Sequence, residues 1–129
     1  MTTILESIVE SKRKEIARCK EITPISVLEE RCRLASLPLN FSGALMGEKP
    51  RLIAEAKKAS PSKGLLVENY DPRSLARIYA LNGAAAVSVL TERENFQGHV
   101  KHMQDVKGVL APLGLPVLRK DFIVDSYQL

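Results

Sequence analysis

Hydrophobic residues in the first part of the chain recur at the three- and four-residue spacing of amphipathic helices. Thr3 and Glu6 form a capping-box pattern at the start of the first predicted helix. Thr23-Pro24 is a second start signal, because proline is favoured at the first position of a helix. A short helical turn is predicted over residues 41–46. The pattern therefore predicts a helical N-terminal extension over residues 1–50.

Each of the two longer predicted helices is expected to bury one face. The buried stripe expected in the second helix consists of Val27, Leu28, Cys32 and Ala35. The basic residues expected to lie mostly on the solvent side of the first helix are Lys12, Arg13, Lys14 and Arg18.

After this extension the pattern changes to alternating strands and helices. The run 84–90 is apolar on both faces, which is typical of a buried parallel strand. Asp71-Pro72 opens a helix and Asn82-Gly83 ends it, while residues 60–64 have the composition of a loop. The predicted elements are strands at 52–57, 84–90 and 116–119, helices at 71–79 and 99–113, and a further helix that starts at Asp125-Ser126.

This alternation is typical of an α/β fold. A repeat of roughly thirty residues per strand–helix unit predicts a (βα)8 TIM barrel of about 250 residues. Three parallel strands do not close a barrel, so residues 51–129 are expected to be its first three βα units, truncated at the start of the third barrel helix. The open sheet edge predicts self-association or pairing with a C-terminal half. A self-sufficient small α/β domain is the alternative.

Composition narrows the class of protein. The 129 residues are 45% hydrophobic and 26% charged, as in an ordinary globular domain. No stretch approaches the ~20 apolar residues of a membrane helix, and residues 1–20 lack the apolar centre of a secretory signal. The net charge of +4 comes from interleaved acids and bases with few aromatic residues, which argues against nucleic acid and favours an anionic small molecule. Cys19 and Cys32 are expected to be reduced and structural, in a cytoplasmic protein.

Three charged residues stand out at the ends of the predicted strands. Glu55 and Lys57 lie two positions apart, so they point to the same face of the first strand, and Lys120 follows the third. The C-terminal ends of barrel strands meet at one mouth. These side chains are therefore expected to meet around an anionic substrate and to take part in proton transfer. The alternatives are an ordinary ion pair for the first two and a solvated strand end for Lys120.

Other candidate residues near the strand ends also have purely structural alternatives. Ser60 could receive phosphate or carboxylate oxygens, or simply cap its turn. Phe96, beside Gly98, could lie against a planar ring, or serve as a lid or packing residue. His99 and His102 have the i, i+3 spacing of a metal pair but no third ligand nearby, so they are expected on a helix surface. No dinucleotide fingerprint or metal cluster is visible, so no cofactor and no metal are predicted.

Three segments of the chain form a combined motif. They are residues 53–62 (IAEAKKASPS), residues 88–92 (SVLTE) with Phe96-Gln97-Gly98, and residues 120–125 (KDFIVD). In order and spacing they resemble the indole-3-glycerol phosphate synthase family over essentially the whole chain. The resemblance implies a (βα)8 barrel and a step of tryptophan biosynthesis. In that step 1-(2-carboxyphenylamino)-1-deoxyribulose 5-phosphate closes to an indole with loss of carbon dioxide and water.

The resemblance also implies a role for each candidate residue. Lys120 is similar to the general acid that protonates the ketose carbonyl oxygen as the aromatic carbon attacks. Lys57 resembles the lysine that contacts the substrate's anionic groups and assists proton transfer, and Glu55 the carboxylate that orients it. The residues implied to bind substrate are Phe96 and Phe122, as an apolar wall around the anthranilate ring, and Ser60, in the same mouth.

The partner that the resemblance implies is a phosphorylated small molecule. The family's second catalytic carboxylate, its active-site asparagine and its phosphate-binding loops have no counterpart in these 129 residues. The piece alone is therefore expected to be inactive or nearly so. The alternatives are another phosphate-binding barrel, such as phosphoribosylanthranilate isomerase, and a non-catalytic truncated half-barrel.

Overall fold

The computed structural model describes residues 1–129, which form two compact units. One unit comprises residues 1–37 together with 122–129, and the other comprises residues 38–121. The second unit runs across residue 50, where the sequence pattern placed a boundary, so that division of the chain stays a prediction. None of the helices combines the length and the apolar composition needed to cross a membrane.

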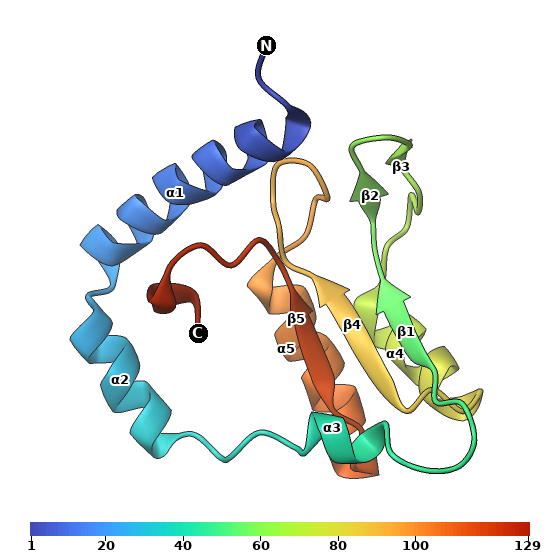
Figure 1. Ribbon diagram of the computed structural model, residues 1–129. Helices are drawn as coiled ribbons and strands as arrows, with labels where there is room; N and C mark the ends of the chain where they lie inside the picture. The colour runs from blue at the N-terminus through green and yellow to red at the C-terminus, as the bar shows by residue number, and fades with distance from the viewer. The chain divides into compact units, whose positions relative to one another are not determined.

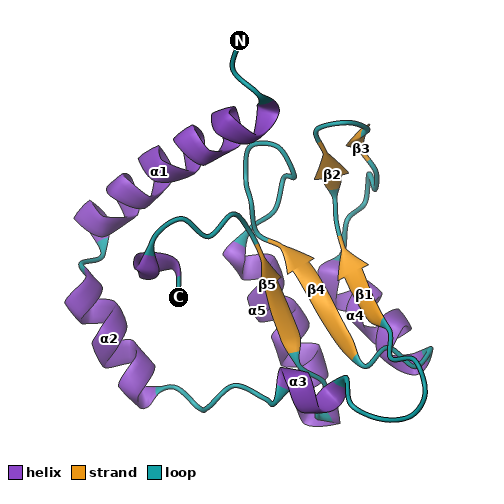
Figure 2. Cartoon of the chain, in the orientation of Figure 1, coloured by secondary structure: helices purple, strands orange, loops and turns teal.

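A three-stranded parallel sheet organises the second unit (Figure 1). Its strands are β1 (Ile53–Ala56), β4 (Ala86–Leu90) and β5 (Val117–Lys120), in the spatial order β1-β4-β5. Two helices, α4 (Pro72–Leu81) and α5 (Val100–Leu110), connect the strands and cover one face of the sheet (Figure 2). The predicted strand–helix alternation is confirmed.

The core of this unit lies between the sheet and the two helices. Every residue of β4 is buried, as predicted for a central parallel strand. On the other face of the sheet, Ile53 and Leu118 each remain 40% exposed. Burial stabilises a large apolar side chain by ~1.5–3 kcal/mol. The fully buried core residues are Ala56, Ala76, Val87, Val89, Val106 and Leu110.

The ends of α4 and α5 follow the signals in the sequence. The Asp71 side chain caps α4 by accepting a hydrogen bond from Arg73 N at 3.0 Å. After α4, Gly83 has a φ of +86°, a left-handed conformation that glycine adopts without steric cost. α5 is shorter than predicted because its last turn tightens into a 3-10 helix, η1 (Ala111–Leu113).

The segment after β1 is a hairpin, and only its turn, residues 61–63, matches the loop predicted over residues 60–64 (Figure 1). β2 (Ala59–Ser60) and β3 (Gly64–Leu65) pair in the antiparallel direction beyond the end of β1. Gly64 turns the chain with a φ of +66°. Each strand has two residues, too few for the alternating pattern that identifies a strand in a sequence.

The helical turn predicted over residues 41–46 is present as α3 (Phe41–Ala44). The Asn40 side chain caps it by accepting a hydrogen bond from Gly43 N at 2.9 Å. Arg51 Nε then donates to the Met46 carbonyl oxygen at 3.2 Å, which braces the turn leading into β1.

The first unit contains α1 (Ile4–Ile22) and α2 (Ile25–Leu34). The capping box predicted for α1 is confirmed. Thr3 N donates to Glu6 Oε2 at 2.7 Å, and Glu6 N donates to Thr3 Oγ1 at 3.2 Å. Cys19 and Cys32 are both free thiols.

The helix start predicted at Asp125 is a 3-10 turn, η2 (Ser126–Gln128). The Tyr127 hydroxyl donates to the Thr23 carbonyl oxygen at 2.7 Å, which ties η2 to the end of α1. An ion pair between Lys20 Nζ and Asp125 Oδ2, at 2.6 Å, joins the same two elements. Sequence-distant ends of this unit are therefore held together by polar contacts.

The buried stripe expected in α2 is wrong, and the solvent side expected for the basic residues of α1 has one exception. Arg13, Lys14 and Arg18 are exposed as expected, but Lys12 is not. Lys12 is only 2% exposed, because it lies four residues from both Ile8 and Ile16 in one buried row of α1. Its Nζ pairs with Glu15 Oε2 at 2.6 Å. α2 buries none of its residues, so its apolar stripe is not covered. An amphipathic pattern specifies which face can be buried but not what buries it.

Candidate active site at the strand ends

Three charged side chains meet at the C-terminal ends of the parallel strands. Glu55 lies in β1, Lys57 follows the end of that strand, and Lys120 is the last residue of β5. Glu55 Oε1 lies 3.0 Å from Lys57 Nζ, and Glu55 Oε2 lies 2.7 Å from Lys120 Nζ. Each carboxylate oxygen therefore binds a different ammonium group. The predicted proximity of these side chains is confirmed.

The register of the sheet explains why they meet. Glu55 pairs with Ser88 of β4, and Ser88 pairs with Leu118 of β5. Residues two apart along a strand share a face, so Lys120 lies on the same face as Leu118, one step nearer the strand end. This face is opposite the one that α4 and α5 cover.

Burial and ion pairing have opposite effects on the pKa of Glu55. Partial burial of the carboxylate raises its pKa, whereas hydrogen bonds from Lys120 and Lys57, and their charges, lower it. The lysines outweigh burial, so the pKa of Glu55 lies below its ordinary value of 4.5. The Tyr79 hydroxyl of α4 also donates to the Glu55 carbonyl oxygen at 3.0 Å. Both the backbone and the side chain of Glu55 are therefore held.

Ser60 serves the hairpin in this structure. Its Oγ accepts a hydrogen bond from Lys63 N at 3.3 Å, which is the turn-capping role considered from the sequence. Phe122 belongs to the other compact unit, where its carbonyl oxygen accepts a hydrogen bond from Gln128 Nε2 at 2.9 Å. Contact of either residue with a substrate stays a prediction.

Phe96 lies in a loop that a buried carboxylate shapes. Glu92, only 1% exposed, accepts hydrogen bonds from three backbone nitrogens of that loop. The distances are 3.1 Å from Glu94 N, 2.8 Å from Asn95 N and 2.9 Å from Phe96 N. Three amide donors on one carboxylate fix the turn and with it the Cα position of Phe96.

Gly98 ends the same loop. Its N–H donates to the Glu92 carbonyl oxygen at 2.7 Å. A Cβ at this position would lie 2.4 Å from the Leu90 carbonyl oxygen, a distance that no side chain tolerates. Gln97, immediately before it, has a φ of +50°. The end of the loop is therefore a tight turn that requires glycine at position 98.

His99 and His102 occupy different environments. His99 is exposed and caps α5, accepting a hydrogen bond from Lys101 N at Nδ1, 2.9 Å away. His102 is half-buried and meets the Tyr70 ring edge-on, with the ring centroids 5.2 Å apart. Burial, then the charges of His99 and Lys58, hold the pKa of His102 below its ordinary 6.5. No three His, Cys, Asp or Glu side chains gather around a point that could hold a metal.

Comparison with known proteins identifies the relatives of this chain. The family described as indole-3-glycerol phosphate synthase matches residues 5–129. The chain belongs to that family. An indole-3-glycerol phosphate synthase of Roseiflexus castenholzii (strain DSM 13941 / HLO8) is 48% identical over 133 residues, covering 100% of this chain and 49% of the relative. The one of Dechloromonas aromatica (strain RCB) is 42% identical over 132 residues, covering 99% and 49%.

The chain spans about half the length of the curated relatives that it matches. The parallel sheet with its two helices is therefore part of the (βα)8 TIM barrel of the indole-3-glycerol phosphate synthase family. In such a barrel the face opposite the helices is the interior. Glu55 and Lys120 lie on that face, which also explains the exposure of Ile53 and Leu118.

Sequence reasoning missed a second polar cluster at the same strand ends, formed by Thr91, Arg119 and Asp121. Thr91 Oγ1 donates to Asp121 Oδ2 at 2.7 Å, and Arg119 Nε donates to Thr91 Oγ1 at 3.1 Å. Arg119 Nη2 lies 3.3 Å from Asp121 Oδ2, which closes the ring of contacts. The signal in the sequence is a polar residue directly after each of two strands.

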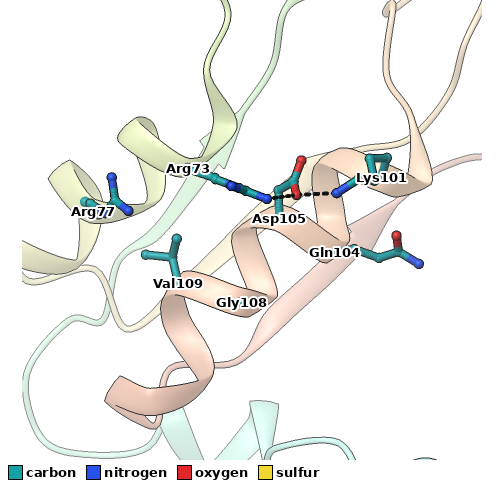
Figure 3. A pocket seen from close by; sticks show the side chains of 7 residues that line it. All are labelled: Arg73, Arg77, Lys101, Gln104, Asp105, Gly108 and Val109. Atoms are coloured by element: carbon teal, nitrogen blue, oxygen red, sulfur yellow. Dashed lines mark hydrogen bonds and ion pairs between the residues drawn. The ribbon is translucent and has the colours of Figure 1, made fainter.

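A separate cavity of about 450 Å³ lies on the helical side, between α4 and α5 (Figure 3). Asp105 Oδ1 binds both Arg73 Nη2, at 2.7 Å, and Lys101 Nζ, at 2.6 Å. Solvent screens these surface pairs, so each contributes little to stability. The Arg73–Asp105 pair ties α4 to α5, whereas Lys101 and Asp105 both belong to α5. The cavity lies on the far side of the sheet from Glu55, so it is not part of the strand-end site.

Proposed function

We propose that this chain carries the lysine side of an indole-3-glycerol phosphate synthase active site. The reaction closes 1-(2-carboxyphenylamino)-1-deoxyribulose 5-phosphate to indole-3-glycerol phosphate, with loss of carbon dioxide and water. The observation that supports the proposal is the Glu55 carboxylate shared by Lys57 and Lys120 at the strand ends. TIM-barrel enzymes place their chemistry at this end of the strands.

The proposed roles follow from the charge that the reaction develops. Ring closure places negative charge on the ketose oxygen, and Lys120, whose side chain is 54% exposed, is the general acid that protonates it. A positioned proton donor contributes roughly 10²–10⁴-fold in rate. Lys57 contacts the anionic groups of the substrate and assists proton transfer. Glu55 holds both ammonium groups in place.

The remaining candidates form the binding wall in this proposal. Phe96, held by the loop around Glu92, and Phe122 provide apolar surface for the anthranilate ring. Ser60 lies in the hairpin beyond β1 and binds a polar substrate group after releasing its 3.3 Å hydrogen bond from Lys63. A phosphorylated small molecule as the partner, and a cytoplasmic location, are part of the same proposal.

Because the chain spans about half the length of its relatives, the activity is proposed for the chain together with the other half. The free sides of β1 and β5 have no strand neighbour here and offer backbone groups for pairing with a C-terminal half or a second copy. Size-exclusion chromatography of the chain, alone and mixed with that half, tests the pairing. The family match favours the synthase over phosphoribosylanthranilate isomerase.

The test mixes the chain with the C-terminal half of the Roseiflexus castenholzii relative and follows indole fluorescence. We expect Lys120→Met to lower the rate by at least roughly 10²-fold. Lys107→Met, an exposed change on α5, is the matched control and should leave the rate unchanged. A wild-type mixture that forms a complex without turning over, or a Lys120→Met mixture that keeps most of the rate, would contradict the proposal.

A further inference from the structure

The cluster of Thr91, Arg119 and Asp121 has no role in the chemistry above. It does contact the backbone of Lys120 and includes both neighbours of that residue. Thr91 N donates to the Lys120 carbonyl oxygen at 2.9 Å. The side chains of the residues before and after Lys120 both contact the Thr91 hydroxyl. One residue at the end of β4 therefore binds three consecutive residues at the end of β5.

The direction of these side chains shows what the arrangement does. Arg119 pairs in register with Val89, a core residue on the face that the helices cover. Lys120, the next residue, points to the opposite face, toward Glu55. Fixing both neighbours of Lys120 on the helical side fixes the direction in which the Cα–Cβ bond of Lys120 leaves the sheet.

Burial of the cluster indicates more than ordinary packing. Thr91 is 2% exposed, and the Asp121 side chain is 1% exposed. Removing a carboxylate from water costs free energy that ion pairs and hydrogen bonds offset only in part. Apolar residues of similar size would join two strands without that cost. What they would not supply is a directional contact on each side of Lys120.

We propose that Asp121, acting with Thr91 and Arg119, is a positioning residue that holds the Lys120 ammonium group against the Glu55 carboxylate. Its meaning for catalysis rests on the function proposed above, in which Lys120 is the general acid. A proton donor acts at full efficiency only when its geometry is fixed before the reaction. The cluster supplies that fixation from the opposite face of the sheet.

The pKa of Glu55 reports whether Lys120 is in place. The charged groups that face Glu55 are Lys57, just after the end of β1, and Lys120 on β5, while β4 between them presents only the Ser88 hydroxyl. Carbon-13 NMR of the Glu55 carboxyl group, titrated in the 129-residue chain between about pH 2 and pH 7, measures this pKa. Lys120→Met, which removes the ammonium group itself, sets the full upward shift.

We expect Thr91→Val, which removes the hydroxyl without changing any charge, to raise the pKa of Glu55 by at least half of that full shift. Asp121→Asn should shift it in the same direction. The direct effect of removing a negative charge is the opposite, because it would lower the pKa of a nearby carboxyl. The sign of the shift therefore separates lost positioning from lost charge.

Thr91→Ser retains the hydroxyl and should keep the wild-type pKa of Glu55. Amide shifts of residues 86–90 verify that β4 is intact in each variant. If Thr91→Val does not fold, Arg119→Lys tests the same ring without changing any charge, at a side chain that is 28% exposed. Folded variants that leave the pKa of Glu55 at its wild-type value, or lower it, would overturn the proposal.

The titration does not depend on turnover, so this inference and the proposed function can fail separately. In an active mixture with the C-terminal half, Thr91→Val should lower kcat about tenfold with KM little changed, and Thr91→Ser should restore it. If the pKa of Glu55 shifts in the variants but the wild-type mixture has no activity, the proposed function is refuted and the positioning role of the cluster is retained. If the wild-type mixture is active but the variants leave the pKa of Glu55 unchanged, the positioning role is refuted and the proposed function is retained.

Discussion

Replacing Glu92 with Gln should loosen the loop that carries Phe96. Glu92 Oε1 accepts from Glu94 N at 3.1 Å and from Asn95 Nδ2 at 3.4 Å. Glu92 Oε2 accepts from Asn95 N at 2.8 Å and from Phe96 N at 2.9 Å. Gln has nearly the same shape but only one acceptor oxygen, so its amide NH₂ group must face donors. The substitution therefore tests acceptor capacity and charge without changing side-chain volume.

The magnitude follows from these bonds. Gln keeps the two shorter bonds by placing its oxygen at the position of Oε2. The Glu94 N–H then faces another donor, and an unsatisfied polar group of this kind costs about 1–3 kcal/mol. The two retained bonds also weaken, because hydrogen bonds to charged acceptors contribute about 1.5–3 kcal/mol and neutral ones about 0.5–1.5 kcal/mol. The two effects together give an expected loss of about 3–6 kcal/mol.

Urea denaturation of the wild type and of Glu92→Gln measures this loss. Glu94→Gln, an exposed change two residues away, is the matched control and should stay within about 0.5 kcal/mol of the wild type. Amide hydrogen exchange at Asn95 and Phe96 should accelerate by at least about a hundredfold in Glu92→Gln, since each 1.4 kcal/mol corresponds to about tenfold. A loss below about 0.5 kcal/mol with unchanged exchange would show that something other than this carboxylate holds the loop.

Three other expectations concern stability. Gly98→Ala should destabilise the chain by about 1–3 kcal/mol, because its Cβ would lie 2.4 Å from the Leu90 carbonyl oxygen. Gly108→Ala lies inside α5, where an added Cβ would have nothing within 4 Å, and should stabilise the chain by about 0.5–1 kcal/mol. Equilibrium unfolding measures both glycine variants, and free-energy changes of the same sign would contradict these two predictions. Glu55 has a lowered pKa, so its contribution is present above its unfolded pKa near 4.5 and is lost as pH falls through the lower folded value. The difference in unfolding free energy between wild type and Glu55→Gln should therefore shrink as the pH falls below about 4.5, and a constant difference would count against the ion pairs. Tyr79→Phe removes the donor to the Glu55 carbonyl oxygen and should cost about 0.5–1.5 kcal/mol in the same assay, whereas an unchanged midpoint would mean that water replaces the bond.

The order of strands and helices was predictable because each element carries its own local signal. Asp71 and Gly83 mark the ends of α4, and the largely apolar run of β4 marks a strand buried on both faces. The hairpin of β2 and β3 was not predictable, because two-residue strands have no period. Lys12 was misplaced because its charge suggested solvent, although its spacing from Ile8 and Ile16 put it in their buried row.

The sequence also predicted which charged residues come together in the candidate site, but not how they pair. That Glu55, Lys57 and Lys120 meet follows from their positions at the ends of strands. That Glu55 divides its two oxygens between the lysines depends on strand register, which no local pattern fixes. Thr91 and Asp121 were missed because a polar residue after a strand looks like the start of a loop. Only the three-dimensional ring with Arg119 shows that both are buried.

The central position of β4 limits how this chain can evolve. β4 has a strand on each side and helices behind it, and all five of its residues are buried. Almost any mutation there displaces close-packed atoms, so few alleles that alter this segment would survive selection. α2, with no buried residue, imposes no such filter, and neutral drift should accumulate there first.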